Sequence, residues 1–145
     1  MTPGRIPEDW ALPALSPHNE AWYTSGQLAL QRCSGCGSTQ HPPEEVCRAC
    51  GGDRFEYVPV RPAGTVHSYT VAHYPVHPAL AGSVPYAVVL VSLDDAPETR
   101  VVGNMPGTPL EEIRIGLPVA AVWEERKAED GTLLLMPHWT IRRDA

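Results

Sequence analysis

Every cysteine of the chain lies in one short segment, CSGCGSTQHPPEEVCRACGG (33–52). Cys33 and Cys36 form one Cys-x-x-Cys pair, and Cys47 and Cys50 form a second pair after a loop of ten residues. Four thiolates at this spacing can close a tetrahedral metal site, and the glycine after each second cysteine permits tight turns that bring backbone amides near the sulfurs. The segment therefore predicts a four-cysteine zinc site, with iron as the alternative metal because it accepts the same ligands.

Other uses of paired cysteines fit this segment less well. A thioredoxin-like redox centre has one such pair beside a βαβ unit, and a c-type haem needs a histidine after the pair. Structural disulfides are uncommon in the cytosol, where we expect the chain because it shows no signal peptide and no apolar run of about 20 residues. Four thiolates leave no open coordination position, so the predicted metal is structural and no cysteine remains as a nucleophile.

A second group of residues that could do chemistry lies between His73 and Tyr86. His73 and His77 could hold a metal or form an acid–base pair, although histidines at a strand end and in a loop show the same pattern. The sequence contains no Gly-x-Ser-x-Gly elbow, phosphate loop or dinucleotide fingerprint. No complete catalytic set is therefore predicted.

The elements that position these residues begin with a proline-rich N-terminal arm, residues 1–15, which carries three apolar anchors: Trp10, Leu12 and Leu15. The stretch SPHNEAWYTSGQ (16–27) predicts a short helix with Ser16 as its N-cap and Gly26 at its end. The stretch QLALQRC (27–33), in which leucines alternate, predicts a strand that leads into the cysteines.

Six stretches after the cysteines either alternate between apolar and polar residues or are apolar throughout, as β-strands are. They are residues 55–61, 64–74, 85–95, 99–105, 117–126 and 132–143. Sixteen prolines and twelve glycines separate the apolar runs, and Asp130-Gly131 predicts a hairpin turn between the last two strands. The sequence therefore predicts a mainly β chain with a five- to six-stranded antiparallel barrel like an OB-fold, and a sandwich is the alternative.

We expect three parts along the chain. An arm, a short helix and a lead-in strand (1–32) precede a zinc ribbon (33–52), and the barrel occupies the remainder (53–145). A chain of 145 residues can bury roughly 70% of its unfolded surface, so its main core does not depend on the metal.

The distribution of charge bears on the class of partner. The formal net charge is −6, and Lys127 is the only lysine among eleven basic residues. Proteins that bind nucleic acid through its phosphates present a basic stripe, which this sequence lacks. The charge therefore argues against nucleic acid as the partner.

Three sets of motifs, in order along the chain, resemble one known family. GQLALQRCSGCGSTQHPPEEVCRACGG resembles its pattern Leu-x-Leu-Gln-Arg-Cys-x-x-Cys, Pro-Pro and Cys-x-x-Cys-Gly. GTVHSYTVAH and PYAVVLVSLDD resemble its first barrel strands, and IGLPVAAVWEE resembles a later one. Over roughly residues 16–139 the chain thus resembles the domain of unknown function 35 family. The resemblance implies an N-terminal helix, a rubredoxin-like zinc ribbon and a C-terminal OB-fold.

Members of that family accompany thiolase-like enzymes that act on acyl-CoA, including synthases and aldolases, some of which cleave sterol side chains. The resemblance implies a non-catalytic accessory subunit in a hetero-oligomer around a dimer of a thiolase-fold partner. The acyl-CoA channel toward the partner's active site would include His73, Tyr74, His77 and Tyr86. The candidate docking residues are Trp10, Trp22, Tyr23, Pro42 and Pro43.

Two alternative functions remain from the residues themselves. One is a single-stranded nucleic-acid-binding OB-fold protein, which the acidic net charge disfavours. The other is an independent enzyme that uses His73 or His77, which the missing catalytic set disfavours.

Overall fold

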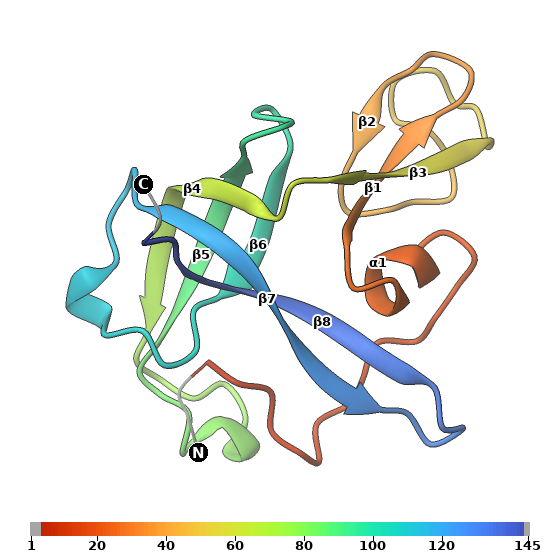
Figure 1. The fold of residues 1–145 in the computed structure, drawn as a ribbon. Helices are drawn as coiled ribbons and strands as arrows, with labels where there is room; N and C mark the ends of the chain where they lie inside the picture. The colour runs from red at the N-terminus through yellow and green to blue at the C-terminus, as the bar shows by residue number, and fades with distance from the viewer. Residues whose placement is uncertain (1–3, 144–145) are drawn as a thin grey trace.

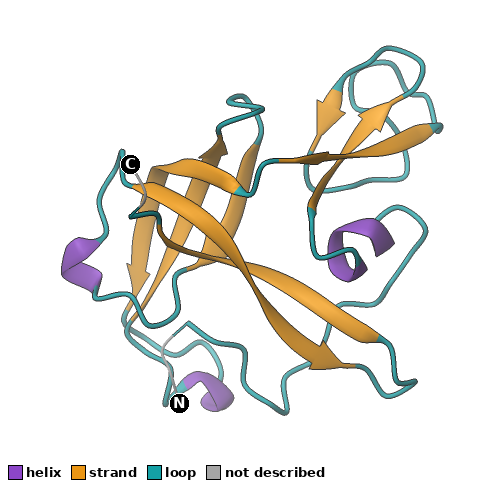
Figure 2. Cartoon of the chain, viewed as in Figure 1, coloured by secondary structure: helices purple, strands orange, loops and turns teal. Residues whose placement is uncertain are grey.

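Two antiparallel sheets and one short α-helix make up the computed structural model, which describes residues 4–143 (Figures 1 and 2). The smaller sheet has the strand order β2 (Thr39–Gln40), β1 (Leu28–Cys33), β3 (Phe55–Val60). The larger sheet has the order β6 (Arg100–Asn104), β5 (Tyr86–Leu93), β4 (Ala63–Ala72), β7 (Pro118–Lys127), β8 (Leu133–Ile141). Short 3-10 helices, η1 (Pro78–Leu80) and η2 (Leu110–Glu112), lie in two connections.

The helix α1 (Glu20–Thr24) is shorter than the predicted one, and the prediction of Ser16 as its N-cap is wrong. Asn19 is the N-cap residue, and its Oδ1 accepts a hydrogen bond from the Ser16 amide at 2.8 Å. That bond closes a turn ahead of the helix, because a short polar side chain can satisfy backbone groups outside helical geometry. Gly26, at φ +68°, ends the helix as predicted. No helix within residues 4–143 is long and apolar enough to cross a membrane.

The stretch 55–61 was predicted to open the barrel, but it pairs with β1 in the smaller sheet instead. The two strands are in register along their whole length, from Leu28 opposite Val60 to Cys33 opposite Phe55. Pro62 lies between β3 and β4. It has no amide hydrogen to donate to a neighbouring strand, so the β-sheet hydrogen bonding is interrupted at this point. The strand before the cysteines therefore has β2 on one edge and β3 on the other.

The larger sheet curls into a five-stranded barrel, which confirms the mainly β, OB-fold-like architecture (Figure 1). Its β5 strand alternates strictly between buried and half-buried residues, and the fully buried face supplies Ala87, Val89, Val91 and Leu93. The last two strands form a hairpin whose turn contains Gly131 at φ +90°, so the predicted turn at Asp130-Gly131 is confirmed.

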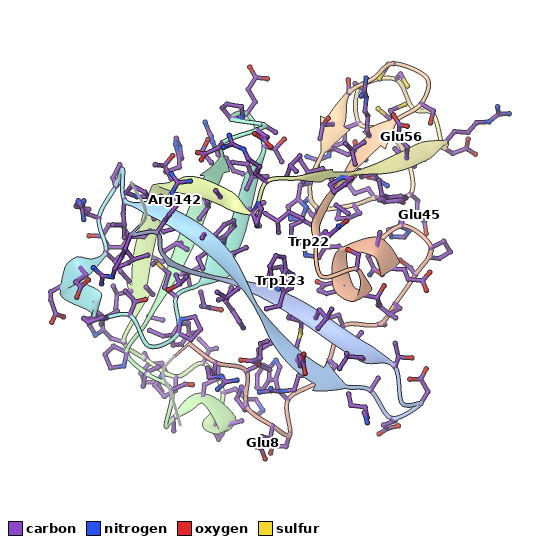
Figure 3. The ribbon with its side chains drawn as sticks, viewed as in Figure 1. Glu8, Trp22, Glu45, Glu56, Trp123 and Arg142 are labelled. Atoms are coloured by element: carbon purple, nitrogen blue, oxygen red, sulfur yellow. The ribbon has the colours of Figure 1, made fainter. Side chains whose placement is uncertain are left out.

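The helix and β1 share one hydrophobic core with the barrel. Trp22, Leu28 and Leu30 belong to the same buried cluster as Val89 and Trp139. Figure 3 shows Trp22 and Trp123 in the space between α1 and the long β7–β8 hairpin. The ribbon half of the molecule is thus packed onto the barrel rather than joined to it by a flexible linker.

Gly103 allows β6 to close against β8, which leads to a first prediction. A Cβ atom at this position would lie 2.7 Å from Cδ1 of the fully buried Trp139. We expect Gly103→Ala to lower the free energy of unfolding by about 1–3 kcal/mol, because the indole cannot move without disturbing the core. Urea denaturation would measure the change. Gly82→Ala is the matched control because a Cβ there meets no atom within 4 Å, and equal stability of the two variants would contradict the prediction.

Candidate metal centre and the adjoining groove

The four cysteine sulfurs converge on one point of the ribbon. All four Sγ atoms lie within 4.8 Å of one another, and two of the separations, Cys33 to Cys50 and Cys36 to Cys47, are 3.6 Å. A tetrahedral site with Zn–S bonds of about 2.3 Å has sulfurs about 3.8 Å apart, so the arrangement fits a single tetrahedral ion. Cys33 and Cys47 are buried whereas Cys36 and Cys50 are exposed. The geometry supports a structural metal at this place.

The two Cys-x-x-Cys turns have the same backbone geometry. In the first turn the Gly37 amide donates to the Cys33 carbonyl at 2.9 Å, and in the second the Gly51 amide donates to the Cys47 carbonyl at 2.8 Å. Gly37 and Gly51 have φ of +77° and +76°, a conformation that favours glycine. Each turn therefore presents its pair of thiols in the same way, and the two face each other as a closed cage.

Hydrogen-bond donors surround the sulfurs, and at Cys36 they favour the thiolate form that a metal requires. The Cys36 Sγ lies 3.2 Å from the Ser38 hydroxyl, and hydrogen bonds from the side chain and backbone of Ser38 lower the pKa of the Cys36 thiol to about 6. The amides of Ala49 and Gly52 each donate to a sulfur at 3.4 Å. Such contacts orient metal ligands and raise their capacity to bind.

Two buried glutamines hold the loop that carries the second cysteine pair. The Gln31 side chain donates to the Glu44 carbonyl at 2.7 Å and accepts from the Glu44 amide at 2.9 Å. Gln40 donates to Gln31 Oε1 at 2.7 Å and to the Val46 carbonyl, and it accepts from the Arg48 amide. Gln31 is the glutamine of the family pattern Leu-x-Leu-Gln-Arg-Cys, which was the sequence signal for it, but the pattern does not tell what its side chain contacts.

Gln31 is fully buried, so its loss should weaken the metal site without touching a ligand. In Gln31→Leu the Glu44 amide and carbonyl lose their partner, and the loop before Cys47 is no longer held in place. We expect metal affinity to fall about tenfold or more, as for other outer-shell changes. Competition with a chelator would measure it. Gln27→Leu, at an exposed position, is the control, and an unchanged affinity in Gln31→Leu would contradict the role.

A groove of about 620 Å³ lies next to the ribbon, where the N-terminal arm, α1, the loop after β2, β6 and β8 meet. Five residues singled out in the sequence as candidate docking residues come from three separate segments, and all of them line this groove: Trp10, Trp22, Tyr23, Pro42 and Pro43. His41, in the same loop, packs on Trp22 with ring centroids 4.3 Å apart. The structure thus brings the separate apolar residues together at one surface.

A buried carboxylate anchors the arm beside this groove. Glu124, only 4% exposed, pairs with Arg5 Nε through Oε1 at 3.0 Å and with Arg126 Nη2 through Oε2 at 2.9 Å. Arg126 also donates to the Ile6 carbonyl. His138 Nε2 lies 3.5 Å from Glu124 Oε1. The arm, β7 and β8 therefore meet at one cluster of charged and titratable side chains.

The ribbon and the barrel both match models of the same protein family. Residues 24–56 match a family model described as "ChsH2, rubredoxin-like zinc ribbon domain", and residues 57–124 match "ChsH2, C-terminal OB-fold domain". A solved chain described as "Ltp2-ChsH2(DUF35) aldolase" has a TM-score of 0.72 and 36% identity, covering 90% of this chain and 98% of that chain. The chain belongs to the ChsH2 (DUF35) family. The predicted family is confirmed.

A curated relative of this DUF35-family chain comes from Thermomonospora curvata and is described as "Probable enoyl-CoA hydratase alpha subunit". The two are 38% identical over 120 residues, which is 81% of this chain and 36% of the relative. The DUF35-family chain thus spans about a third of the length of the curated relative it matches.

None of the four residues predicted for an acyl-CoA channel is among the residues that line the groove. His73 and Tyr74 are exposed, Tyr74 at 81%. His77 Nδ1 accepts a hydrogen bond from the Ala79 amide, and its ring meets Trp10 edge-on at 5.1 Å. Tyr86 lines a small cavity of about 210 Å³ that the arm covers. Of the four residues, Tyr86 is the one that lines this cavity in the DUF35-family chain.

Proposed function

We propose that this chain is a non-catalytic accessory subunit of an acyl-CoA-processing complex and docks to a thiolase-fold enzyme subunit. The observation that carries the proposal is the similarity over nearly the whole chain to the DUF35 component of a structure described as an Ltp2-ChsH2(DUF35) aldolase. The relative described as an enoyl-CoA hydratase subunit supports the same class of thioester substrate. Lipid metabolism, including the degradation of sterol side chains, is the setting that the resemblance favours.

The metal in this proposal is zinc, held by Cys33, Cys36, Cys47 and Cys50. Zinc bound by four thiolates supplies folding energy and offers no position for water or substrate. All four thiols are then ligands, so the chain has no cysteine nucleophile of its own. The chemical step would belong to the partner, which must supply its own acid–base groups.

The acyl-CoA contact in this proposal runs along the segment from His73 to Tyr86. Tyr74 and Val76 lie two residues apart and are exposed at 81% and 82%, more than any other large hydrophobic residue described. A partner subunit seated over this segment would bury both residues and would make the segment one wall of a substrate channel. The docking surface in this proposal is the groove lined by Trp10, Trp22 and Pro43.

The test of this function is co-expression with a thiolase-fold subunit, chosen first from any such protein encoded in the same operon. We expect the two proteins to purify as one complex that high salt does not separate, because the docking residues are apolar, and we expect turnover of an acyl-CoA only when both are present. Size-exclusion chromatography with light scattering and a coupled CoA-release assay would measure these outcomes. Turnover by the isolated chain, or the absence of any complex, would contradict the assignment.

A further inference from the structure

A cluster of charged side chains attaches the N-terminal arm to the barrel. Arg5 on the arm donates to Glu124 Oε1 at 3.0 Å, and Arg126 on β7 contacts Glu124 Oε2 at 2.9 Å and donates to the carbonyl of Ile6. Residues 4–19 form no helix or strand, and in Figure 1 the arm passes from beside η1 to the end of the β7–β8 hairpin. With so little structure of its own, the arm depends on these contacts and on the packing of its apolar side chains.

His138 on β8 lies beside the oxygen to which Arg5 donates. Its Nε2 is 3.5 Å from Glu124 Oε1, the imidazole is buried, and within residues 4–143 neither ring nitrogen makes a hydrogen bond. The cluster already holds two guanidinium groups against one carboxylate, so a proton on His138 would add positive charge where burial makes it costly. A protonated His138 and Arg5 would therefore compete for the same carboxylate oxygen.

The docked arm favours the neutral form of His138. Burial lowers the pKa of the imidazole most, Glu124 raises it, and Arg5 and Arg126 lower it. When the arm leaves, Arg5 leaves with it and the imidazole becomes more accessible to water, because Ile6 of the arm lines the groove beside it. Glu124 remains, so the released form binds a proton at His138 more tightly than the docked form does.

Two other titratable side chains among the described residues line the groove with His138: Tyr23 on α1 and His41 in the loop after β2. Burial raises the pKa of Tyr23, and burial together with Arg48 lowers the pKa of His41 to about 4, so both stay uncharged from pH 5.5 to 8. The β6 strand contributes Val102, Gly103 and Asn104, which do not titrate. His138 is therefore the member of this lining whose charge changes in that range.

We propose that docking of the N-terminal arm is linked to a proton: the arm stays docked while His138 is neutral, and it is released when His138 takes up a proton and replaces Arg5 as the partner of Glu124. This device goes beyond the accessory role and does not depend on it. Since one proton is bound on release, the docking constant changes by up to about tenfold per pH unit. Docking is at full strength at pH values above the ordinary pKa of histidine, about 6.5, and weakens as the pH falls below it.

Release of the arm would change two parts of the surface. The ring of Trp10 would separate from that of His77, whose centroid lies 5.1 Å away, and the cavity of about 210 Å³ lined by Leu80 and Tyr86 would lose the arm that covers it. The groove beside the ribbon would lose Ile6 and Trp10 from its lining. A fall in pH would thus open the cavity and widen the groove together.

Tryptic cleavage after Arg5 measures the released fraction, because the docked arm pairs this side chain with Glu124. The full zinc-loaded chain and a free peptide with the sequence of residues 1–12 would be digested from pH 5.5 to 8, and the ratio of the two rates removes the pH dependence of the protease. We expect this ratio to rise about fivefold or more from pH 7.5 to pH 5.5 in the unaltered chain and to stay constant in His138→Gln. His77→Gln is the matched control, because His77 contacts Trp10 of the arm, and this variant should keep the pH dependence.

A second measurement does not depend on the folding of His138→Gln. In Arg5→Gln, NMR titration of the imidazole should give His138 a proton affinity about tenfold higher than in the unaltered chain, whereas Arg114→Gln, which removes an exposed charge elsewhere, should leave it unchanged. Four results would each overturn the inference. They are a cleavage ratio that does not vary with pH, an equal pH dependence in folded His138→Gln, a loss of the pH dependence in His77→Gln, and an equal proton affinity of His138 in Arg5→Gln and in the unaltered chain.

Discussion

Replacing Cys47 with alanine is expected to release the metal and to unfold the ribbon between residues 33 and 52. Cys47 is buried, and its Sγ lies 3.6 Å from that of Cys36 across the cage. Zinc bound to four ligands in small domains contributes about 10–16 kcal/mol to the folded state, so the loss of one thiolate removes most of what orders this loop. The barrel should remain largely folded, because its core residues lie outside the ribbon.

Two measurements check this expectation. Metal analysis of the purified Cys47→Ala protein should find much less than one equivalent, and hydrogen exchange should become fast in residues 33–52 while β5 stays protected. Val46→Ala is the matched control, since Val46 is the exposed neighbour of Cys47 and should retain the metal. A Cys47→Ala protein with a full equivalent of zinc would refute the four-cysteine site.

Replacing Glu124 with alanine is expected to free the N-terminal arm. The side chain of Arg126 is 20% exposed and would lose its carboxylate partner, as would Arg5. Removing one member of a buried ion pair leaves an uncompensated charge, so we expect a loss of about 3 kcal/mol in the free energy of unfolding. Because both arginine contacts to the arm depend on this carboxylate, residues 4–13 should also detach from the β7–β8 hairpin.

Urea denaturation would measure the stability of Glu124→Ala, and hydrogen exchange of the arm would report its detachment. Glu125→Ala is the control, because Glu125 is exposed on the other face of the same strand and should change stability by less than about 0.5 kcal/mol. If the arm exchanges equally slowly in both variants, Glu124 is not its anchor.

Local patterns in the sequence were sufficient for the metal site and for most strands. The spacing of Cys33, Cys36, Cys47 and Cys50 predicted the site because each Cys-x-x-Cys turn, with a glycine after it, can present two sulfurs to one metal ion. The strands from β4 to β8 were predicted because each stretch either alternates with period two or is apolar throughout, and Asp130-Gly131 marks a turn by its own conformational preference. Each of these features depends on residues that are close in the chain.

Only the tertiary structure decided which separated residues meet. The stretch 55–60 has the pattern of any strand, and its pairing with β1 instead of the barrel depends on a partner more than twenty residues away. The helix α1 begins later than predicted because the Asn19 side chain accepts a hydrogen bond from the Ser16 amide. Gln31, Glu124 and His138 carry no sequence signal for their roles, since a buried polar side chain is defined by neighbours that come from other elements. The groove is a further example. Its apolar side chains could be identified one by one in the sequence, but they line one groove only because helix, ribbon and barrel share a core.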